Sequence, residues 1–482
     1  MEQTIKIYNS LEREKQPFTP LNPKDKEVKM YVCGPTVYDE PHIGHARSAY
    51  IFDVIRRYLI YKGYKVKFVR NVTDVDDKII DKARNEFPGE DLKIAVEKVA
   101  TKYLSSYHEA LEKLGISAKE PEVIEPKASE YIPKMTEFIA RLIENGVAYA
   151  AGGDVYFDIT KARNYGKLSN QSLDKMEVGV RVVPEENKKN PLDFALWKSA
   201  KPEEPSWDSP WGKGRPGWHI ECSVMSSDIL GEEFDIHGGG IDLIFPHHEN
   251  EIAQSEGAGG KFAKYWIHHG LLTINGQKMA KSLGNFVTIK DFINKYQDPD
   301  LLKLFFLSAH YSHPIDYSEE KIEEAKKSYE RFRILFHKID REFGTRETKK
   351  FPDASMGNIK IFRETFEKAM DDDFNTPQAI GVLFNMVNEC NKILDNKEDD
   401  RRFMLRTAME TIVELASIFG LTFQDIDEEK SDTWVTIAIS MREQYRKAKK
   451  FKEADEVRKA LESKGIILED TKDGKTAWRR KL

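Results

Sequence analysis

The first part of the chain alternates short apolar runs with amphipathic stretches. VKMYVCG (28–34) and YKVKFVRNV (64–72) are runs typical of buried strands. Residues 44–63 and 75–87 place apolar side chains at helical spacing, and a glycine ends the first of these stretches. Strand, helix, strand and helix in this order predict a βαβ unit with a parallel sheet.

The pattern changes twice further along the chain. Helical spacing continues to about residue 150, and a Gly/Pro/Trp-rich stretch then covers 197–223 before α/β signals resume up to about residue 290. Beyond residue 300 the chain is almost wholly helical, and the long amphipathic stretch 318–343 is typical of a helical bundle. A polar break at 424–433 precedes the end segment. The pattern predicts an α/β body split by an insertion, followed by an all-α half.

Composition narrows the class of protein. The 482 residues include 40% hydrophobic and 32% charged residues, and no apolar run reaches the length of a membrane span. The N-terminus lacks the apolar core of a signal peptide, and three cysteines cannot form a disulfide framework. We therefore expect a cytoplasmic protein with no membrane partner.

The charge is unevenly distributed. The whole chain carries −6, whereas Met441–Leu482 holds 14 Lys+Arg against 8 Asp+Glu. A basic end on an acidic protein indicates a local phosphate-binding surface, and a solvated charged helix explains it equally well.

Two histidines stand where the first helix is predicted to begin. His42 and His45 are three residues apart, just after a strand and a turn. Free N–H groups at a helix start favour anions, and imidazoles there can donate hydrogen bonds to a polyphosphate. The alternative is one helix-capping histidine and one core histidine. A metal pair is less consistent, because zinc-binding helix pairs usually have i, i+4 spacing.

A glycine-bounded loop offers a second phosphate-binding candidate. GQKMAKSLGN (276–285) contains Lys278, Lys281 and Ser282. Lysines beside glycines suit a loop that closes over phosphates and neutralises developing charge. Taken alone, an ordinary surface loop is the simpler interpretation.

Metal-ligand chemistry is spread over three segments. Cys33 and Thr73 fall at the carboxyl ends of the first two predicted strands, where ligands of parallel sheets bind. Cys222 lies in GWHIECS (217–223), and the run PHHENE (246–251) follows. If that run is helical, His247 and Glu251 share one face, which completes a possible four-ligand zinc set. The cysteines can equally be buried small hydrophobes, and His248 or Glu249 can substitute for their neighbours.

Several motifs together resemble a known family. PHIGH (41–45) and KMAKS (278–282) resemble the paired ATP signatures of class I aminoacyl-tRNA synthetases, with Ala280 where serine is usual. Five segments in order resemble the cysteinyl-tRNA synthetase family, and the resemblance covers essentially the whole chain. They are CGPTVYDEPHIGHARS, RNVTDVDDKII, GRPGWHIECS, FDIHGGGIDLIFPHHENEIAQSE and NGQKMAKSLGN.

The resemblance implies roles for individual residues. One Zn²⁺ per chain would be held by Cys33, Cys222, His247 and Glu251. The amino-acid pocket would include Gly34, Thr73 and Trp218. The ATP site would comprise His42, Gly44, His45, Lys278, Lys281 and Ser282, of which His42, His45, Lys278 and Lys281 would be catalytic.

The resemblance also implies the reaction. The expected substrates are ATP with Mg²⁺, L-cysteine and tRNA(Cys), and the expected state is a monomer. Pocket shape separates near-isosteres only modestly, whereas zinc prefers a thiolate over the neutral hydroxyl of serine. Zinc would therefore select the substrate without an editing domain.

The same resemblance implies a Rossmann-type catalytic domain and a division of the chain. The expected parts are the first catalytic half with the HIGH motif (1–120), a connective insertion (121–205), the second catalytic half with the zinc ligands and the KMSKS-type loop (206–298), a stem-contact helical region (299–345), a tRNA-binding helical bundle (346–425) and a basic anticodon-binding domain (426–482).

Two other functions share part of this pattern. A ligase that joins cysteine to an amino sugar would share the zinc and ATP motifs but lack the basic end. A catalytically inert zinc-dependent RNA-binding protein would have damaged ATP motifs, whereas both histidines and both lysines are intact. KIIDK (78–82) also resembles a lysine motif linked to pyridoxal phosphate, although an amphipathic helix explains it without a cofactor.

Overall fold

The computed structural model describes residues 4–172, 187–344, 357–396, 401–423, 432–470 and 476–480. Within this part of the chain, no helix is long and apolar enough to span a membrane. The polar break predicted at 424–433 lies mostly outside the described residues.

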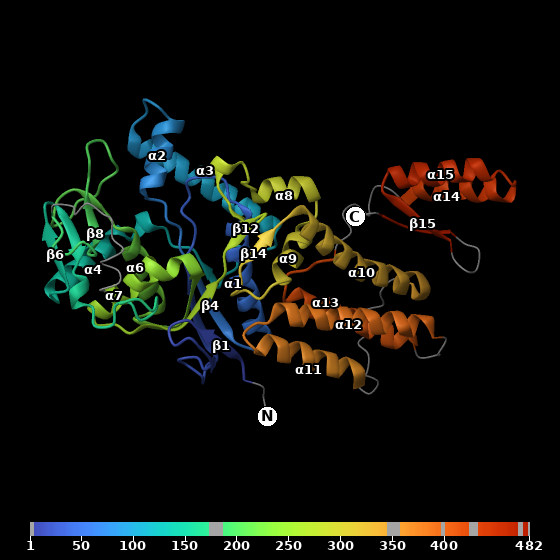
Figure 1. The fold of residues 1–482 in the computed structure, drawn as a ribbon, viewed down its shortest axis with the longest axis horizontal. Helices are drawn as coiled ribbons and strands as arrows, with labels where there is room; N and C mark the ends of the chain where they lie inside the picture. The colour runs from blue at the N-terminus through green and yellow to red at the C-terminus, as the bar shows by residue number, and fades with distance from the viewer. Residues whose placement is uncertain are drawn as a thin grey trace.

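A five-stranded parallel sheet forms the centre of the molecule (Figure 1). Its strand order is β11-β10-β3-β4-β5, with every neighbouring pair parallel. The strands are β3 (Glu27–Val32), β4 (Lys65–Arg70), β5 (Val123–Ile124), β10 (Glu233–Gly240) and β11 (Phe262–His269). Seven of the eight residues of β10 are buried, as expected where helices cover both faces of a parallel sheet. The predicted βαβ unit is confirmed.

Helices connect and cover these strands. Their bounds are α1 (Ile43–Tyr61), α2 (Asp77–Glu86), α3 (Leu92–Lys113), α6 (Trp218–Leu230) and α7 (Glu249–Gly257). A π-helical turn, η4 (Ile244–His248), leads directly into α7. The starts of α1 and α7 therefore lie at the carboxyl edge of the sheet, next to the ends of β3 and β10.

A separate antiparallel sheet interrupts the body built on the parallel sheet. It contains β6 (Ala148–Ala151), β7 (Asp154–Phe157), β8 (Phe194–Ser199) and β9 (Gly214–Pro216), and it follows η1 (Ala128–Tyr131) and α4 (Ile132–Glu144). A short turn, η2 (Ile159–Lys161), follows β7. The side chains of this sheet and of α4 share one apolar core with α6. The insertion is therefore packed against the helix that carries Cys222.

Small sheets hold the N-terminus and the lysine loop. β1 (Lys6–Asn9) pairs with β2 (Glu14–Pro17), and β12 (Leu272–Ile274) pairs with both β13 (Gln277–Lys278) and β14 (Ile315–Tyr317). The short helical segments here are η3 (Ile241–Leu243), η5 (Lys281–Leu283), α8 (Ile289–Tyr296) and α9 (Pro299–Leu307).

The second half of the chain is helical, as predicted, and lies across the sheet from the insertion (Figure 1). Its helices are α10 (Glu319–Phe343), α11 (Gly357–Asp371), α12 (Thr376–Asp395) and α13 (Arg401–Ser417). A C-terminal unit follows, with α14 (Asp432–Lys447), α15 (Phe451–Ser463), β15 (Ile466–Asp470) and β16 (Thr476–Arg480). This unit has an apolar core of its own.

Candidate active site

Two cysteines from distant segments meet at the carboxyl edge of the sheet. Cys33 follows β3 and Cys222 lies in α6, and their sulfur atoms are 3.8 Å apart. His247 lies in η4, and its Nε2 atom is 2.9 Å from Oε1 of Glu251 in α7. The ligand atoms of the four residues all lie within 4.8 Å of one another. The structure thus brings the four predicted ligand residues together.

The geometry of this cluster fits a metal ion such as zinc. Two sulfurs bound to zinc at about 2.3 Å in a tetrahedral site would lie roughly 3.8 Å apart, which matches the observed spacing. Cys222, His247 and Glu251 are buried and Cys33 is half-buried. Two sulfurs, one imidazole and one carboxylate are ligands that zinc accepts.

The charges of the cluster favour a cation between these side chains. Burial would raise the pKa of Cys222, but hydrogen bonding from Cys33 lowers it to about 6. Burial would lower the pKa of His247, but Glu251 and Cys222 raise it to about 10. Burial opposes ionisation of Glu251, yet His237 and His247 lower its pKa to about 2. The cluster therefore stabilises positive charge, carried by the His247 imidazolium where no metal ion is bound.

A second possible ligand set shares two of these residues. It combines Cys33 and Glu251 with His237 and His248. Nε2 of His237 is 2.8 Å from Oε2 of Glu251, and Nε2 of His248 is 3.2 Å from Sγ of Cys33. The structure therefore places His248 beside the cluster as well, and the alternative to His247 has a physical basis. Only the first set contains both sulfurs.

A layer of histidines backs the cluster, and the sequence interpretation missed most of it. Nδ1 of His248 is 2.8 Å from Nε2 of His268, and Nδ1 of His268 is 2.8 Å from the Ser10 hydroxyl. His237 lies in β10 and His268 in β11. Both are fully or nearly fully buried, and the sequence gave no signal of that burial, because other polar residues stand in the same strands.

The predicted amino-acid pocket residues border the same cluster. The Trp218 indole stacks on the His247 ring at 4.2 Å between centroids and remains 41% exposed, so it forms an outer wall. Thr73 is buried and donates its hydroxyl to Glu221 at 2.7 Å. Gly34 follows Cys33 directly, and a Cβ atom there would lie 1.7 Å from the backbone oxygen of Asn71. Only glycine therefore allows the ends of β3 and β4 to approach so closely.

His42 and His45 cap the start of α1 for each other. Nδ1 of His42 accepts hydrogen bonds from the backbone N–H groups of Gly44 (3.1 Å) and His45 (3.4 Å), and Nδ1 of His45 accepts one from the backbone N–H of His42 (3.2 Å). Backbone N–H groups only donate, so both neutral rings carry their proton on Nε2. The capping interpretation and the anion interpretation are thus compatible, because each ring keeps an outward N–H donor.

Both rings stay neutral at ordinary pH. Burial lowers the pKa of His42 to about 4, despite the opposing charge of Asp39. Burial, with the added charges of His42 and Lys78, lowers the pKa of His45 to about 3. The rings stack at 3.7 Å between centroids, which fixes their relative position.

The lysine loop is attached to the histidine segment. The backbone N–H of Ile43 donates to Val287 (3.1 Å), and that of Ile289 donates to Pro41 (2.9 Å). The Lys281 ammonium pairs with the Asp39 carboxylate. Two of the loop's predicted residues, Lys278 and Ser282, are exposed. The structure therefore brings the two motifs, more than two hundred residues apart in sequence, to the same place.

Comparison with known proteins identifies the family. Residues 19–327 match the model described as tRNA synthetases class I (C) catalytic domain, and residues 365–424 match the DALR domain. The protein named Cysteine--tRNA ligase in Persephonella marina is 47% identical, over 99% of this chain and 100% of its own length. The protein of that name in Thermococcus gammatolerans is also 47% identical, over 99% of each chain. The chain belongs to the cysteine–tRNA ligases.

Solved synthetases of other specificity share the fold of this ligase. Mycobacterium tuberculosis methionyl-tRNA synthetase in complex with methionyl-adenylate superimposes with a TM-score of 0.58 at 14% identity, over 82% of this chain and 90% of its own. A putative arginyl-tRNA synthetase from Campylobacter jejuni gives 0.56 at 15% identity, over 84% and 96%. The class I fold predicted from the motifs is confirmed.

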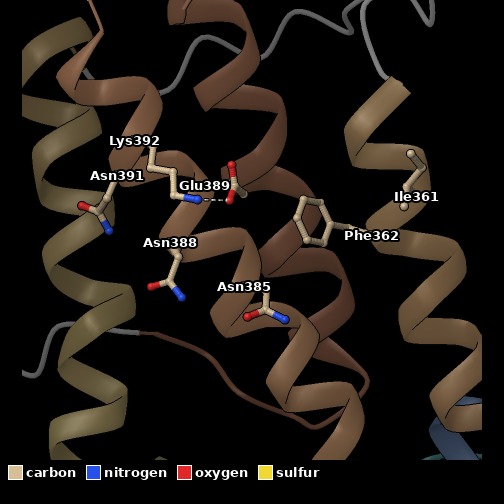
Figure 2. A pocket seen from close by; sticks show the side chains of 7 residues that line it. All are labelled: Ile361, Phe362, Asn385, Asn388, Glu389, Asn391 and Lys392. Atoms are coloured by element: carbon tan, nitrogen blue, oxygen red, sulfur yellow. Dashed lines mark hydrogen bonds and ion pairs between the residues drawn. The ribbon is translucent and has the colours of Figure 1, made fainter.

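A separate depression of about 800 Å³ lies on the helical half of the ligase. Figure 2 shows the side chains that line it. Asn385, Asn388 and Asn391 line it from successive turns of α12. The Arg331 guanidinium in α10 donates to Asn388 at 2.9 Å, so one of these amides is already engaged across the helices. None of the predicted site residues lines this depression.

The basic end of the ligase is partly structural. Arg442 is 3% exposed and donates to the Thr476 hydroxyl at 2.9 Å, and half-buried Trp478 packs on the core of the C-terminal unit. Arg442 therefore braces α14 against β16 rather than facing solvent. The side chains of Trp434, Arg479 and Arg480 lie outside the described residues.

Proposed function

We propose that the chain joins L-cysteine to the 3′ end of tRNA(Cys) in two steps. The cysteine carboxylate attacks the α-phosphorus of ATP, which releases pyrophosphate and leaves cysteinyl-adenylate. A ribose hydroxyl of the terminal adenosine of the tRNA then attacks the acyl carbon and releases AMP. Neither step needs a protein nucleophile, so the side chains act by positioning and by stabilising charge.

Zinc selection of the substrate is part of this proposal. Cys33, Cys222, His247 and Glu251 would hold one Zn²⁺, which supplies a preference for thiolate over hydroxyl. The sulfur spacing of 3.8 Å and the cation-stabilising charges support this set over the one with His237 and His248. Gly34, Thr73 and Trp218 would shape the pocket beside it.

The residues that would catalyse adenylate formation lie in the two motifs PHIGH (41–45) and KMAKS (278–282). The Nε2–H groups of His42 and His45 are neutral donors that would bind phosphate oxygens and stabilise charge in the transition state. Lys278 and Lys281 would add positive charge from the loop, with Ser282 beside them and Mg²⁺ accompanying ATP. Gly44 leaves space for the His42 ring, because a Cβ atom there would lie 2.8 Å from that ring.

The helical half and the basic end would bind the tRNA. A DALR domain match at 365–424 supports the expected helical bundle at 346–425. We propose the other domain bounds as expected from the sequence, at 1–120, 121–205, 206–298, 299–345 and 426–482. We also propose that the protein works as a monomer in the cytoplasm.

The observation that carries the proposal is the pair of sulfurs at metal-binding distance beside the ATP motifs of the class I fold. ATP–pyrophosphate exchange with cysteine and with serine tests it. Exchange should require cysteine and should fail after zinc is stripped by a chelator. Equal exchange with serine, or exchange that survives removal of the metal, would refute the zinc selection.

A further inference from the structure

Three buried polar side chains lie between the two segments that carry the cysteines. Asn71 and Thr73 follow β4, and Glu221 lies in α6. They are 2%, 2% and 1% exposed. Buried polar groups are costly unless they are hydrogen-bonded, so the partners of these three side chains indicate what they do.

The three side chains form one chain of hydrogen bonds. The backbone N–H of Gly34 donates to Oδ1 of Asn71 at 2.8 Å. Because that N–H can only donate, it fixes the amide orientation, and Nδ2 of Asn71 faces the Thr73 hydroxyl at 3.3 Å. Thr73 passes the hydrogen bond on to Oε2 of Glu221 at 2.7 Å.

The ends of this chain are the immediate neighbours of the two cysteines. Gly34 follows Cys33, and Glu221 precedes Cys222. Oδ1 of Asn71 also lies 3.7 Å from the Cys222 sulfur, so one amide touches both segments.

Thr73, in the middle, is held by its backbone. Its N–H donates to Pro35 at 3.0 Å, and its C=O accepts from Val37 at 3.2 Å. Because the backbone of Thr73 is fixed, the hydrogen bonds on either side of it fix the positions of Asn71 and Glu221 relative to each other.

We infer that Asn71 and Glu221 are positioning residues that hold the Cys33 and Cys222 sulfurs at the spacing a zinc ion requires. This inference rests on the proposed function, because it concerns the residues that set the spacing of the two sulfurs proposed to bind zinc. Two thiolates repel each other, and β3 and α6 come from parts of the chain about 190 residues apart. The hydrogen-bonded chain Asn71–Thr73–Glu221, called the brace below, links these two segments. It holds their sulfurs 3.8 Å apart before a metal ion binds.

The test compares variants that break or keep the brace. Glu221→Ala removes the acceptor for Thr73, whereas Glu221→Gln keeps an oxygen at that place. Ser226→Ala is the matched control, because Ser226 is buried in the same helix and its hydroxyl donates to the backbone carbonyl of Ser223 within that helix. Zinc affinity is measured by chelator competition without amino acid, and the cobalt-substituted protein reports its sulfur-to-metal absorption.

Glu221→Ala should weaken zinc binding about tenfold or more, as removal of groups that orient metal ligands commonly does. Its cobalt absorption should change, and its preference for cysteine over serine in pyrophosphate exchange should fall. Glu221→Gln and Ser226→Ala should retain all three properties. The KM for ATP should stay unchanged in every variant, because the brace does not touch the ATP motifs.

Wild-type zinc affinity and an unchanged cobalt spectrum in Glu221→Ala would overturn the inference, even if its activity fell. If Glu221→Ala does not fold, Thr73→Val breaks the same hydrogen bond with little change in volume, and its metal affinity decides in the same way. The proposed function fails separately, if the wild-type protein needs no metal to activate cysteine.

Discussion

Replacing Gly44 by alanine should favour the helix α1 but displace the His42 ring, so this substitution tests the role of that ring. Gly44 lies in the first turn of α1, where alanine would ordinarily stabilise a helix by up to about 1 kcal/mol. A Cβ atom at this position, however, would lie 2.8 Å from Cε1 and 2.9 Å from Nδ1 of His42. The substitution Gly44→Ala therefore forces the His42 ring to move.

The size of that movement follows from the contacts. Carbon atoms pack at about 3.5–4.0 Å, so the ring must retreat by roughly 1 Å. His45 stacks on it at 3.7 Å between centroids, and Phe286 contacts it edge-on at 5.3 Å, so the ring cannot keep its two hydrogen bonds to the helix start. Misplacement of a catalytic group by about 1 Å costs on the order of 100-fold in rate, or about 2.7 kcal/mol in the barrier.

Pyrophosphate exchange at saturating cysteine measures this loss, and thermal unfolding measures stability in parallel. Gly381→Ala is the control, because Gly381 lies inside α12, and among the described residues the added Cβ would meet no side chain or other element within 4 Å. The control should gain about 1 kcal/mol of stability and keep full exchange activity. Exchange by Gly44→Ala within threefold of wild type would refute the role of the His42 ring.

Three further outcomes are expected. Lys281→Ala should lower exchange by about 100-fold or more, with ATP affinity nearly unchanged, if its charge acts on the transition state as proposed; equal losses in both would contradict this. Because the pKa of His45 lies near 3, well below the value of 6.5 for an unfolded chain, its neutral form stabilises the protein fully above pH 6.5 and progressively less as the pH falls. About 2 kcal/mol should be lost by about pH 5, so the urea midpoint of His45→Asn should fall less on acidification than that of wild type, and equal falls would exclude the assignment. A chain ending at residue 423 should keep pyrophosphate exchange and lose tRNA charging, because the C-terminal unit has its own core; loss of both activities would show that the unit supports the catalytic body.

The spacing of apolar residues predicted the longer strands and helices of the α/β body. The expected strand at 28–34 and helix at 44–63 correspond to β3 and α1, which are Glu27–Val32 and Ile43–Tyr61. The β1–β2 pair and the insertion sheet were not predicted, since most of their strands have only three or four residues, too few to show a period.

The site was predicted where a motif concentrates chemistry in few residues. His247 and Glu251 share a helical face, and that spacing alone brought them together correctly. Asp39 gave no such signal, because its partner Lys281 is more than two hundred residues away. Glu221 was hidden for a different reason, since a carboxylate beside a cysteine reads as ordinary surface charge until its burial is known.

The loop that carries Lys278 and Lys281 is tied down at both of its ends. The pairing of β12 with β14 holds it before residue 275, and the hydrogen bond from Ile289 to Pro41 holds it after residue 287. A protease that cuts after either lysine would therefore leave two fragments that remain associated. If the lysines act as proposed, such a nicked protein should lose pyrophosphate exchange while its sheet and helices stay assembled.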